Sequence, residues 1–310
     1  MEHGGYYLVT DQLAKLFPGR VIDFPPDETS LLGAAMGFAQ VGLTPIVEIP
    51  YAKYLDCGSD MFYEICITNW LSAGQQRNGM VIRLQGFDRG LFGGNFHTHN
   101  MLSNIPPGVD VVCYSNGEDY VRGFRNALDQ AKAGRVVVSV DSTHLLNLRH
   151  VHGKDRAWER CYPELMITET SRMSFDEVIR YGTTGRSAVV TYGNGVVTAL
   201  QARKALVDNG FIASEAELDV IDCPCLSMVP EGLKKVLPQY QGVLFADICK
   251  GGPGSNVLSS MIVALHEDGL LPAHWNTVFA PRTYNPLGSV ETFLNAIDVE
   301  VGWQKLAKQL

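Results

Sequence analysis

Short apolar runs rich in Val and Ile recur along the chain, separated by longer stretches in which apolar residues have helical spacing. Such runs are typical of buried strands. We predict strands at 20–24, 45–49, 79–84, 111–114, 135–140, 187–192, 218–222, 243–247 and 276–280. Helices are predicted at 8–16, 30–40, 59–73, 117–133, 196–208, 251–266 and 289–297. This alternation indicates an α/β protein whose mostly parallel sheets are covered by helices on both faces.

A stretch after position 149 contains many charges, Pro163 and little periodicity. This composition is typical of a segment that connects two domains. We therefore predict a first domain at 1–148, a linker at 149–181 and a second domain at 182–310.

The composition limits the classes of partner. The 310 residues are 46% hydrophobic and carry a formal net charge of −8, which gives no basic surface for nucleic acid. No apolar run approaches the length of a membrane span. Seven scattered cysteines do not fit a disulfide framework and indicate a reducing, intracellular compartment. The Cys223-Pro224-Cys225 run lacks further ligands nearby, so packing is favoured over zinc binding and no metal ligand is assigned.

One acidic residue, Glu28, lies at a predicted bend between a strand and a helix. Pro25 and Pro26 keep the chain extended before it, and Thr29 or Ser30 is suited to cap the helix that follows. The simplest interpretation is a carboxylate favoured by the helix dipole. From the residues alone, that interpretation is the better one.

Two further loops carry candidate side chains. Tyr54 follows the strand at 45–49, at the sheet edge where open α/β folds bind ligands, although aromatic residues there are more often core. A glycine-rich loop at 86–96 leads to His97 and His99, and it lacks the Lys-Ser/Thr ending of a phosphate loop. Imidazole suits proton transfer near neutral pH, but a lone loop histidine is more often a plain surface residue.

The run 20–48 and the glycine loop before His97 resemble the beta subunits of thiamine-diphosphate-dependent 2-oxo acid dehydrogenase decarboxylases, of the pyruvate and branched-chain type. The resemblance extends over nearly the whole chain and implies a pyrimidine-binding domain followed by a transketolase C-terminal-like domain. It implies that Glu28 hydrogen-bonds the aminopyrimidine ring of the cofactor and favours its imino tautomer, which removes the proton from the thiazolium carbon. It also implies that Tyr54 stacks on that ring, that His97 is the active-site histidine, and that His99, where the family has Gln, faces substrate.

The resemblance also implies partners. The chain has no Gly-Asp-Gly motif, which holds magnesium and diphosphate in these enzymes. An alpha-type subunit or domain is therefore expected to hold Mg²⁺ and complete the thiamine diphosphate site, and a lipoyl carrier of an acyltransferase is expected to accept the acyl group. Gly33, Gly37 and Asp60 match subunit-packing features and predict self-association within a heterotetramer. The implied location is the bacterial cytoplasm or the mitochondrial matrix.

Two departures from the family keep other interpretations open. The family has a strand and a helix upstream of the part that resembles Gly5, so the first domain is expected to lack them. The family often has a second histidine where this chain has the run 104–108. A non-catalytic assembly or regulatory relative of the same fold is therefore the alternative. A nicotinamide-dependent oxidoreductase would rest on topology alone.

Overall fold

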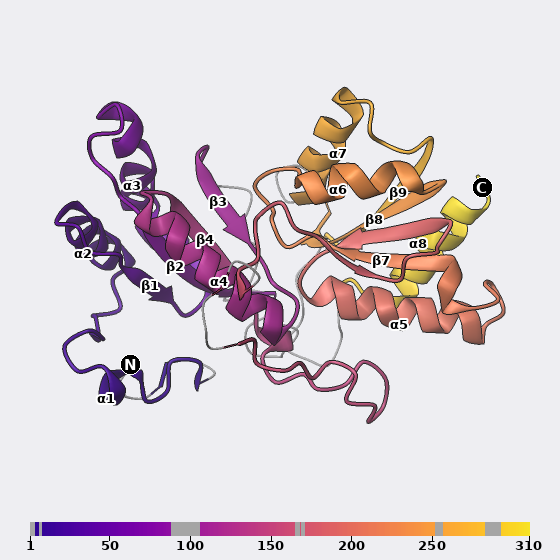
Figure 1. The fold of residues 1–310 in the computed structure, drawn as a ribbon, viewed down its shortest axis with the longest axis horizontal. Helices are drawn as coiled ribbons and strands as arrows, with labels where there is room; N and C mark the ends of the chain where they lie inside the picture. The colour runs from indigo at the N-terminus through magenta and orange to yellow at the C-terminus, as the bar shows by residue number, and fades with distance from the viewer. Residues whose placement is uncertain are drawn as a thin grey trace.

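The computed structural model describes residues 4–5, 8–87, 106–164, 168, 171–251, 257–282 and 293–310. They form two sheets that lie side by side, each covered by helices (Figure 1). The predicted α/β class with two mostly parallel sheets is confirmed, and the exact domain boundaries stay a prediction.

The first sheet has the order β1-β2-β4-β3, and every pair of neighbouring strands is parallel. Its strands are β1 (Ile46–Ile49), β2 (Met80–Gly86), β3 (Val109–Val112) and β4 (Val136–Ser142). One face packs under α2 (Glu28–Gln40) and α3 (Ser59–Leu71). The opposite face packs under α4 (Gly117–Lys132). Because β2 is covered on both faces, it is buried along its whole length.

The second sheet has the order β5-β7-β6-β8-β9, in which only β5 is antiparallel to its neighbour. Its strands are β5 (Ile179–Tyr181), β6 (Ser187–Thr191), β7 (Leu218–Asp222), β8 (Gly242–Lys250) and β9 (His274–Ala280). One face packs under α5 (Asn194–Asp208) and α8 (Ala296–Ala307), and the other under α6 (Glu231–Val236) and α7 (Val257–Glu267). Short helical elements are α1 (Leu13–Leu16), η2 (Ala52–Gly58), η4 (Thr143–Leu145), η6 (Glu215–Glu217) and η7 (Leu237–Gln239).

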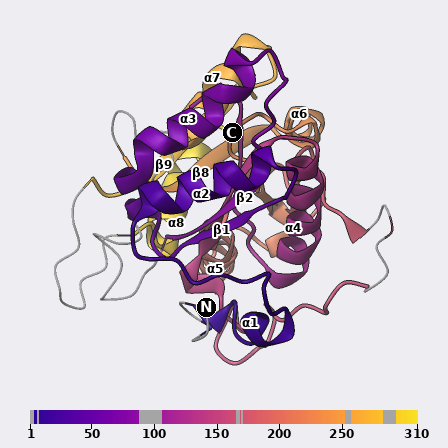
Figure 2. The ribbon, with the colours of Figure 1, turned by 90° about the vertical axis from the view of Figure 1, so that its left-hand side faces the viewer.

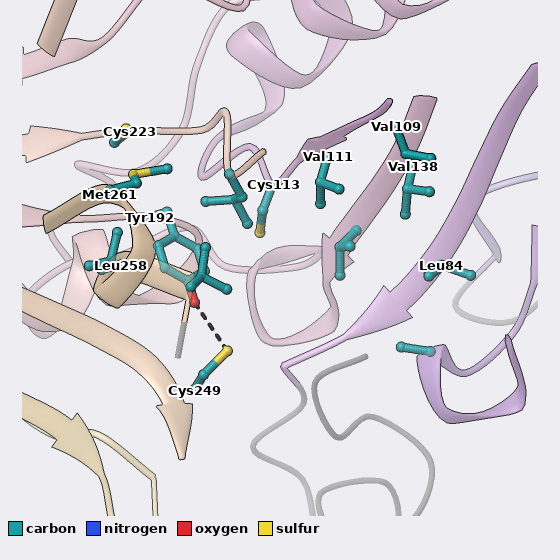
Figure 3. Close-up of a cluster of buried hydrophobic side chains, with 14 of the residues drawn as sticks. Leu84, Val109, Val111, Cys113, Val138, Tyr192, Cys223, Cys249, Leu258 and Met261 are labelled. Carbon is teal, nitrogen blue, oxygen red and sulfur yellow. Dashed lines mark hydrogen bonds between the residues drawn. The ribbon is translucent and has the colours of Figure 1, made fainter. Parts of the chain in front are cut away.

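The two sheets share a core at their junction. The cluster in Figure 3 joins Val111 and Val138 of the first sheet to Tyr192 and Cys249 of the second unit. The backbone N–H of Cys113 donates to the carbonyl of Pro224 over 2.8 Å, so the chain after β7 extends the edge at β3. This contact fixes the two units against each other through backbone hydrogen bonds as well as apolar packing.

Two predicted elements near the start are wrong. Residues 20–24 form no strand, and Ile22 and Phe24 are exposed, because the charges of Arg20 and Asp23 interrupt the apolar run and two prolines follow it. The predicted helix at 8–16 is reduced to the single turn α1, because Gln12 before it has a left-handed backbone.

The second half differs from the prediction at its last helix, and the predicted linker contains regular structure. A helix that begins at 289 and ends at 297 is not what the described residues show: 293–295 are not helical, and α8 begins at Ala296, where Asn295 and Asp298 form a capping box. The predicted linker contains β5, and its Trp158 and Met173 side chains are buried. Trp158 donates from its indole N–H to the Ser115 carbonyl over 3.0 Å, so this segment is packed against the first unit.

Within the described ranges, no helix combines the length and the apolar character that crossing a bilayer requires.

Candidate functional site

Glu28 is the first residue of α2. The helix is capped by Asp27, whose carboxylate accepts hydrogen bonds from the Ser30 backbone N–H at 3.4 Å and hydroxyl at 2.5 Å. These hydrogen bonds lower the pKa of Asp27. The prediction that Thr29 or Ser30 is the cap is therefore wrong by two or three positions, because Asp27 reaches the free N–H groups of the first turn.

The start of α2 is fixed against the end of η2. The Thr29 hydroxyl donates to the Cys57 carbonyl over 3.1 Å. A Cβ placed on Gly58 would lie only 3.0 Å from the carbonyl carbon of Glu28 and 2.9 Å from Leu32 Cδ1. Only glycine allows this approach of the two backbones, so residues 57 and 58 determine where Glu28 sits.

The Glu28 carboxylate has no hydrogen bond or ion pair to any residue in the described part of the chain. Its side chain is half-buried, unlike that of its neighbour Thr29, which is exposed. Glu28 lies in the first turn of α2, at the end of the helix that carries the positive end of the helix dipole. A half-buried acceptor of this kind is available to a donor from outside the described residues.

Tyr54 lies on η2, which follows β1 directly at the carboxyl end of the sheet and packs against α2. Its ring meets the buried ring of Tyr51 edge-on, with centroids 5.8 Å apart and an interplanar angle of 80°. Tyr54 itself is half-buried and packs against the core of the first sheet. The tyrosine pair therefore holds one partly accessible ring on the element that adjoins the start of α2.

The other predicted residues are two histidines and the subunit-packing positions. His97 and His99 lie outside the described residues. Asp60 is an exposed residue in the first turn of α3, and a Cβ placed on Gly33 would lie 3.6 Å from Met61 Cε of the same chain. No cluster of three His, Cys, Asp or Glu side chains suited to a metal ion occurs among the described positions.

A buried charge cluster on the α4 face of the first sheet was not predicted from the sequence. The Arg83 guanidinium lies 2.9 Å from a carboxylate oxygen of Glu48 and 2.5 Å from a carboxylate oxygen of Asp141. Its Nε–H also donates to the Tyr120 hydroxyl over 3.3 Å. All three charged side chains are more than nine-tenths buried. Burial raises the pKa of Asp141 to about 6, although Arg83 opposes the shift. The sequence does carry a signal for this cluster, because each of three neighbouring strands has one charged residue within an otherwise apolar run.

The chain has curated relatives. It is 28% identical over 308 residues to the pyruvate dehydrogenase E1 component subunit beta of Chlorokybus atmophyticus. The aligned part covers 96% of this chain and 84% of the relative. It is 34% identical over 99 residues, or 31% of this chain and 28% of the relative, to the 2-oxoisovalerate dehydrogenase subunit beta of Pseudomonas aeruginosa. A third relative, 25% identical over 91% of this chain and 78% of its own length, is the acetoin:2,6-dichlorophenolindophenol oxidoreductase subunit beta of Cupriavidus necator.

No protein-family profile matches the chain. A solved structure described as a split gene transketolase, inactive beta4 tetramer, superposes with a TM-score of 0.67 over 96% of this chain and 87% of its own. Its sequence is only 18% identical, so this likeness concerns the fold. The resemblance to the beta subunits of 2-oxo acid dehydrogenases is thus confirmed, on a fold shared with a transketolase-like protein.

Proposed function

We propose that this chain is the beta-type component of a thiamine-diphosphate-dependent 2-oxo acid dehydrogenase and supplies the aminopyrimidine half of the cofactor site. The observation that carries the proposal is the Glu28 carboxylate, which is half-buried and unpartnered within the described residues. The start of α2 that carries Glu28 is fixed by the close approach of Gly58 and by the hydrogen bond from the Thr29 hydroxyl to the Cys57 carbonyl of η2, so the carboxylate is presented from a fixed backbone.

The residues present fit the aminopyrimidine group. Thiamine diphosphate, when bound, supplies a thiazolium ring whose carbon acts as the nucleophile toward the oxo group. Glu28 would accept a hydrogen bond from a ring N–H and hold a proton there, a role that suits a carboxylate because it exchanges protons without moving. Tyr54 would present its accessible ring face to the same flat group. His97 and His99 are proposed to face the substrate.

The same proposal includes partners. An alpha-type subunit or domain would hold Mg²⁺ and the diphosphate, and the enzyme would act only with that partner. A lipoyl carrier of an acyltransferase would accept the acyl group. The names of the relatives, which are beta subunits, and the beta4 tetramer of the structural neighbour support a chain that assembles with others and with itself. We propose an intracellular location, either the bacterial cytoplasm or the mitochondrial matrix.

The half-site proposal is tested by calorimetric titration of thiamine diphosphate with Mg²⁺. The isolated chain should show no tight binding, because a charged diphosphate needs a metal and ligands that the partner supplies. The chain assembled with the alpha-type subunit that co-purifies with it should bind tightly. Submicromolar binding by the chain alone would overturn the half-site. An assembled complex that binds no cofactor would favour the alternative of a non-catalytic assembly or regulatory relative.

A further inference from the structure

The loop 149–160, which follows β4 and η4, is basic although the protein is acidic. It contains four Lys or Arg and two acidic residues. The whole chain has 25 Lys or Arg and 33 Asp or Glu, which leaves 21 against 31 for all other positions. The four cations are all exposed, and they are Arg149, Lys154, Arg156 and Arg160. In Figure 1 the loop extends below both sheets, and Figure 2 shows it at the same lower end of the molecule.

The two acidic side chains of the loop are used within it. Asp155 accepts hydrogen bonds from three backbone N–H groups of the loop, at 2.8 to 3.1 Å. Glu159 pairs with Arg156, whose guanidinium lies 2.6 Å away. Arg149 is 3.9 Å from Glu159 and its side chain is 72% exposed, and Lys154 has no ion pair within the described part of the chain. The charges of Arg149 and Lys154 are therefore available to a partner.

The backbone of the loop is fixed against both units. Trp158 is buried, its indole N–H donates to the Ser115 carbonyl over 3.0 Å, and its ring stacks on that of Tyr181 with centroids 5.8 Å apart. Val151 is also buried, and its carbonyl accepts a hydrogen bond from Gln201 over 2.9 Å. Because both large apolar side chains point inward, the loop presents charge to water from a fixed backbone. Such preorganisation lowers the entropic cost of binding.

We propose that the loop 149–160 is the docking surface for an acidic face of the lipoyl carrier domain. This inference rests on the proposed function, in which the carrier must reach the cofactor site. The loop follows the carboxyl end of β4, and Trp158 ties it to the chain after β3, so it starts from the same edge of the sheet as η2. β1 and β3 are three strand spacings apart, or about 15 Å. A domain of 100 residues has a radius of gyration of about 13 Å, so a carrier docked on the loop can also face the candidate site.

The character of this surface favours a transient partner over a permanent one. Permanent interfaces are large and apolar, whereas the large apolar side chains of this loop are buried in its own fold. Complementary charge instead accelerates the encounter and gives specificity without requiring tight affinity. The carrier has to arrive and leave in every turnover, whereas the alpha-type subunit stays bound. The carrier is therefore the partner that a charged, rigid loop suits.

The test uses the enzyme assembled with its alpha-type subunit, with the lipoyl domain of its acyltransferase as the varied substrate and pyruvate or 2-oxoisovalerate as the oxo acid. The double variant Arg149→Glu/Lys154→Glu should raise the KM for the lipoyl domain by about 10-fold or more at low salt. Added salt should raise the wild-type KM toward that of the variant, because it screens exposed charges. The melting temperature should change little. Activity with the dye 2,6-dichlorophenolindophenol as electron acceptor needs no carrier and should stay unchanged.

The matched control is Lys305→Glu/Lys308→Glu, which makes the same change in charge at two exposed positions at the end of α8. It should leave the KM for the lipoyl domain unchanged. A loop variant with the wild-type KM, a control with an equal rise, or a loop variant that loses the alpha-type subunit would each overturn the proposal. So would a wild type that is active with the dye but transfers nothing to the lipoyl domain. A wild type inactive with the dye and both oxo acids would instead contradict the proposed function, and this inference with it.

Discussion

The first unit contains two kinds of carboxylate in very different surroundings. Glu48 and Asp141 lie inside the sheet, more than nine-tenths buried, and both contact the guanidinium of Arg83. Glu28 lies at the start of α2, half-buried, with no partner among the described residues. Buried carboxylates are retained only where a cation or hydrogen bonds compensate them, whereas a carboxylate left free at a ligand-binding edge is available for chemistry. The contrast separates an acid fixed for structure from one positioned for a ligand.

The largest expected effect on stability comes from removing the shared cation. Arg83→Leu leaves Glu48 and Asp141 buried without their counter-charge and should lower the free energy of unfolding by about 3 to 5 kcal/mol. Urea unfolding measures it. The control, Arg149→Leu, removes an exposed guanidinium 3.9 Å from Glu159 and should change stability little. Equal effects of the two variants would contradict the structural role of the cluster.

A second prediction concerns pH. The folded-state pKa of Asp141 is raised to about 6 from an ordinary value of 3.8, so the folded protein binds that proton more tightly than the unfolded chain. The stabilisation that this proton binding gives the folded protein is fully present below about pH 4. It is lost as the pH rises through 6, and the total loss in the free energy of unfolding is about 3 kcal/mol. Asp141→Asn should remove this component. The stability difference between wild type and variant should therefore shift across that window; a constant difference would contradict the prediction.

A smaller effect is expected from the glycine that positions Glu28. Gly58→Ala forces a methyl group against the Glu28 backbone and Leu32, which should cost about 1 to 3 kcal/mol and displace the start of α2. Gly117→Ala is the control, because a Cβ there meets nothing within 4 Å. Thermal unfolding compares them. If Gly58→Ala were as harmless as Gly117→Ala, the close approach would not position Glu28.

Much of the fold could be predicted because it depends on local pattern. The buried strand β2 and the helix α4 follow from their apolar spacing. The segment 20–24 could not be predicted correctly, because burial of a short apolar run depends on a neighbouring strand that the sequence does not specify. The Arg83 cluster was missed for a related reason: its three members come from strands distant in sequence, and only their register brings them together.

The candidate site was predictable in part. The bend at Glu28 follows from Pro25, Pro26 and the helix signal, but the role of Gly58 depends on a contact between two elements. The assignment of Glu28 and Tyr54 to a cofactor came from the family resemblance, since residue types at these positions favour structural roles. His97 and His99 stay predictions, because they lie outside the described residues.

The most direct test of the account replaces Glu28 by Gln in the assembled enzyme and measures the exchange of the thiazolium-carbon proton of bound cofactor for deuterium. Glu118→Gln is the matched control, because Glu118 is also a half-buried glutamate in the first turn of a helix with an Asx cap. Both variants should lower stability by at most about 1 kcal/mol. Glu28→Gln should slow the exchange by about 100-fold or more, because the proton-holding carboxylate is lost, while Glu118→Gln should leave it unchanged. An unchanged exchange rate in Glu28→Gln would contradict the assignment.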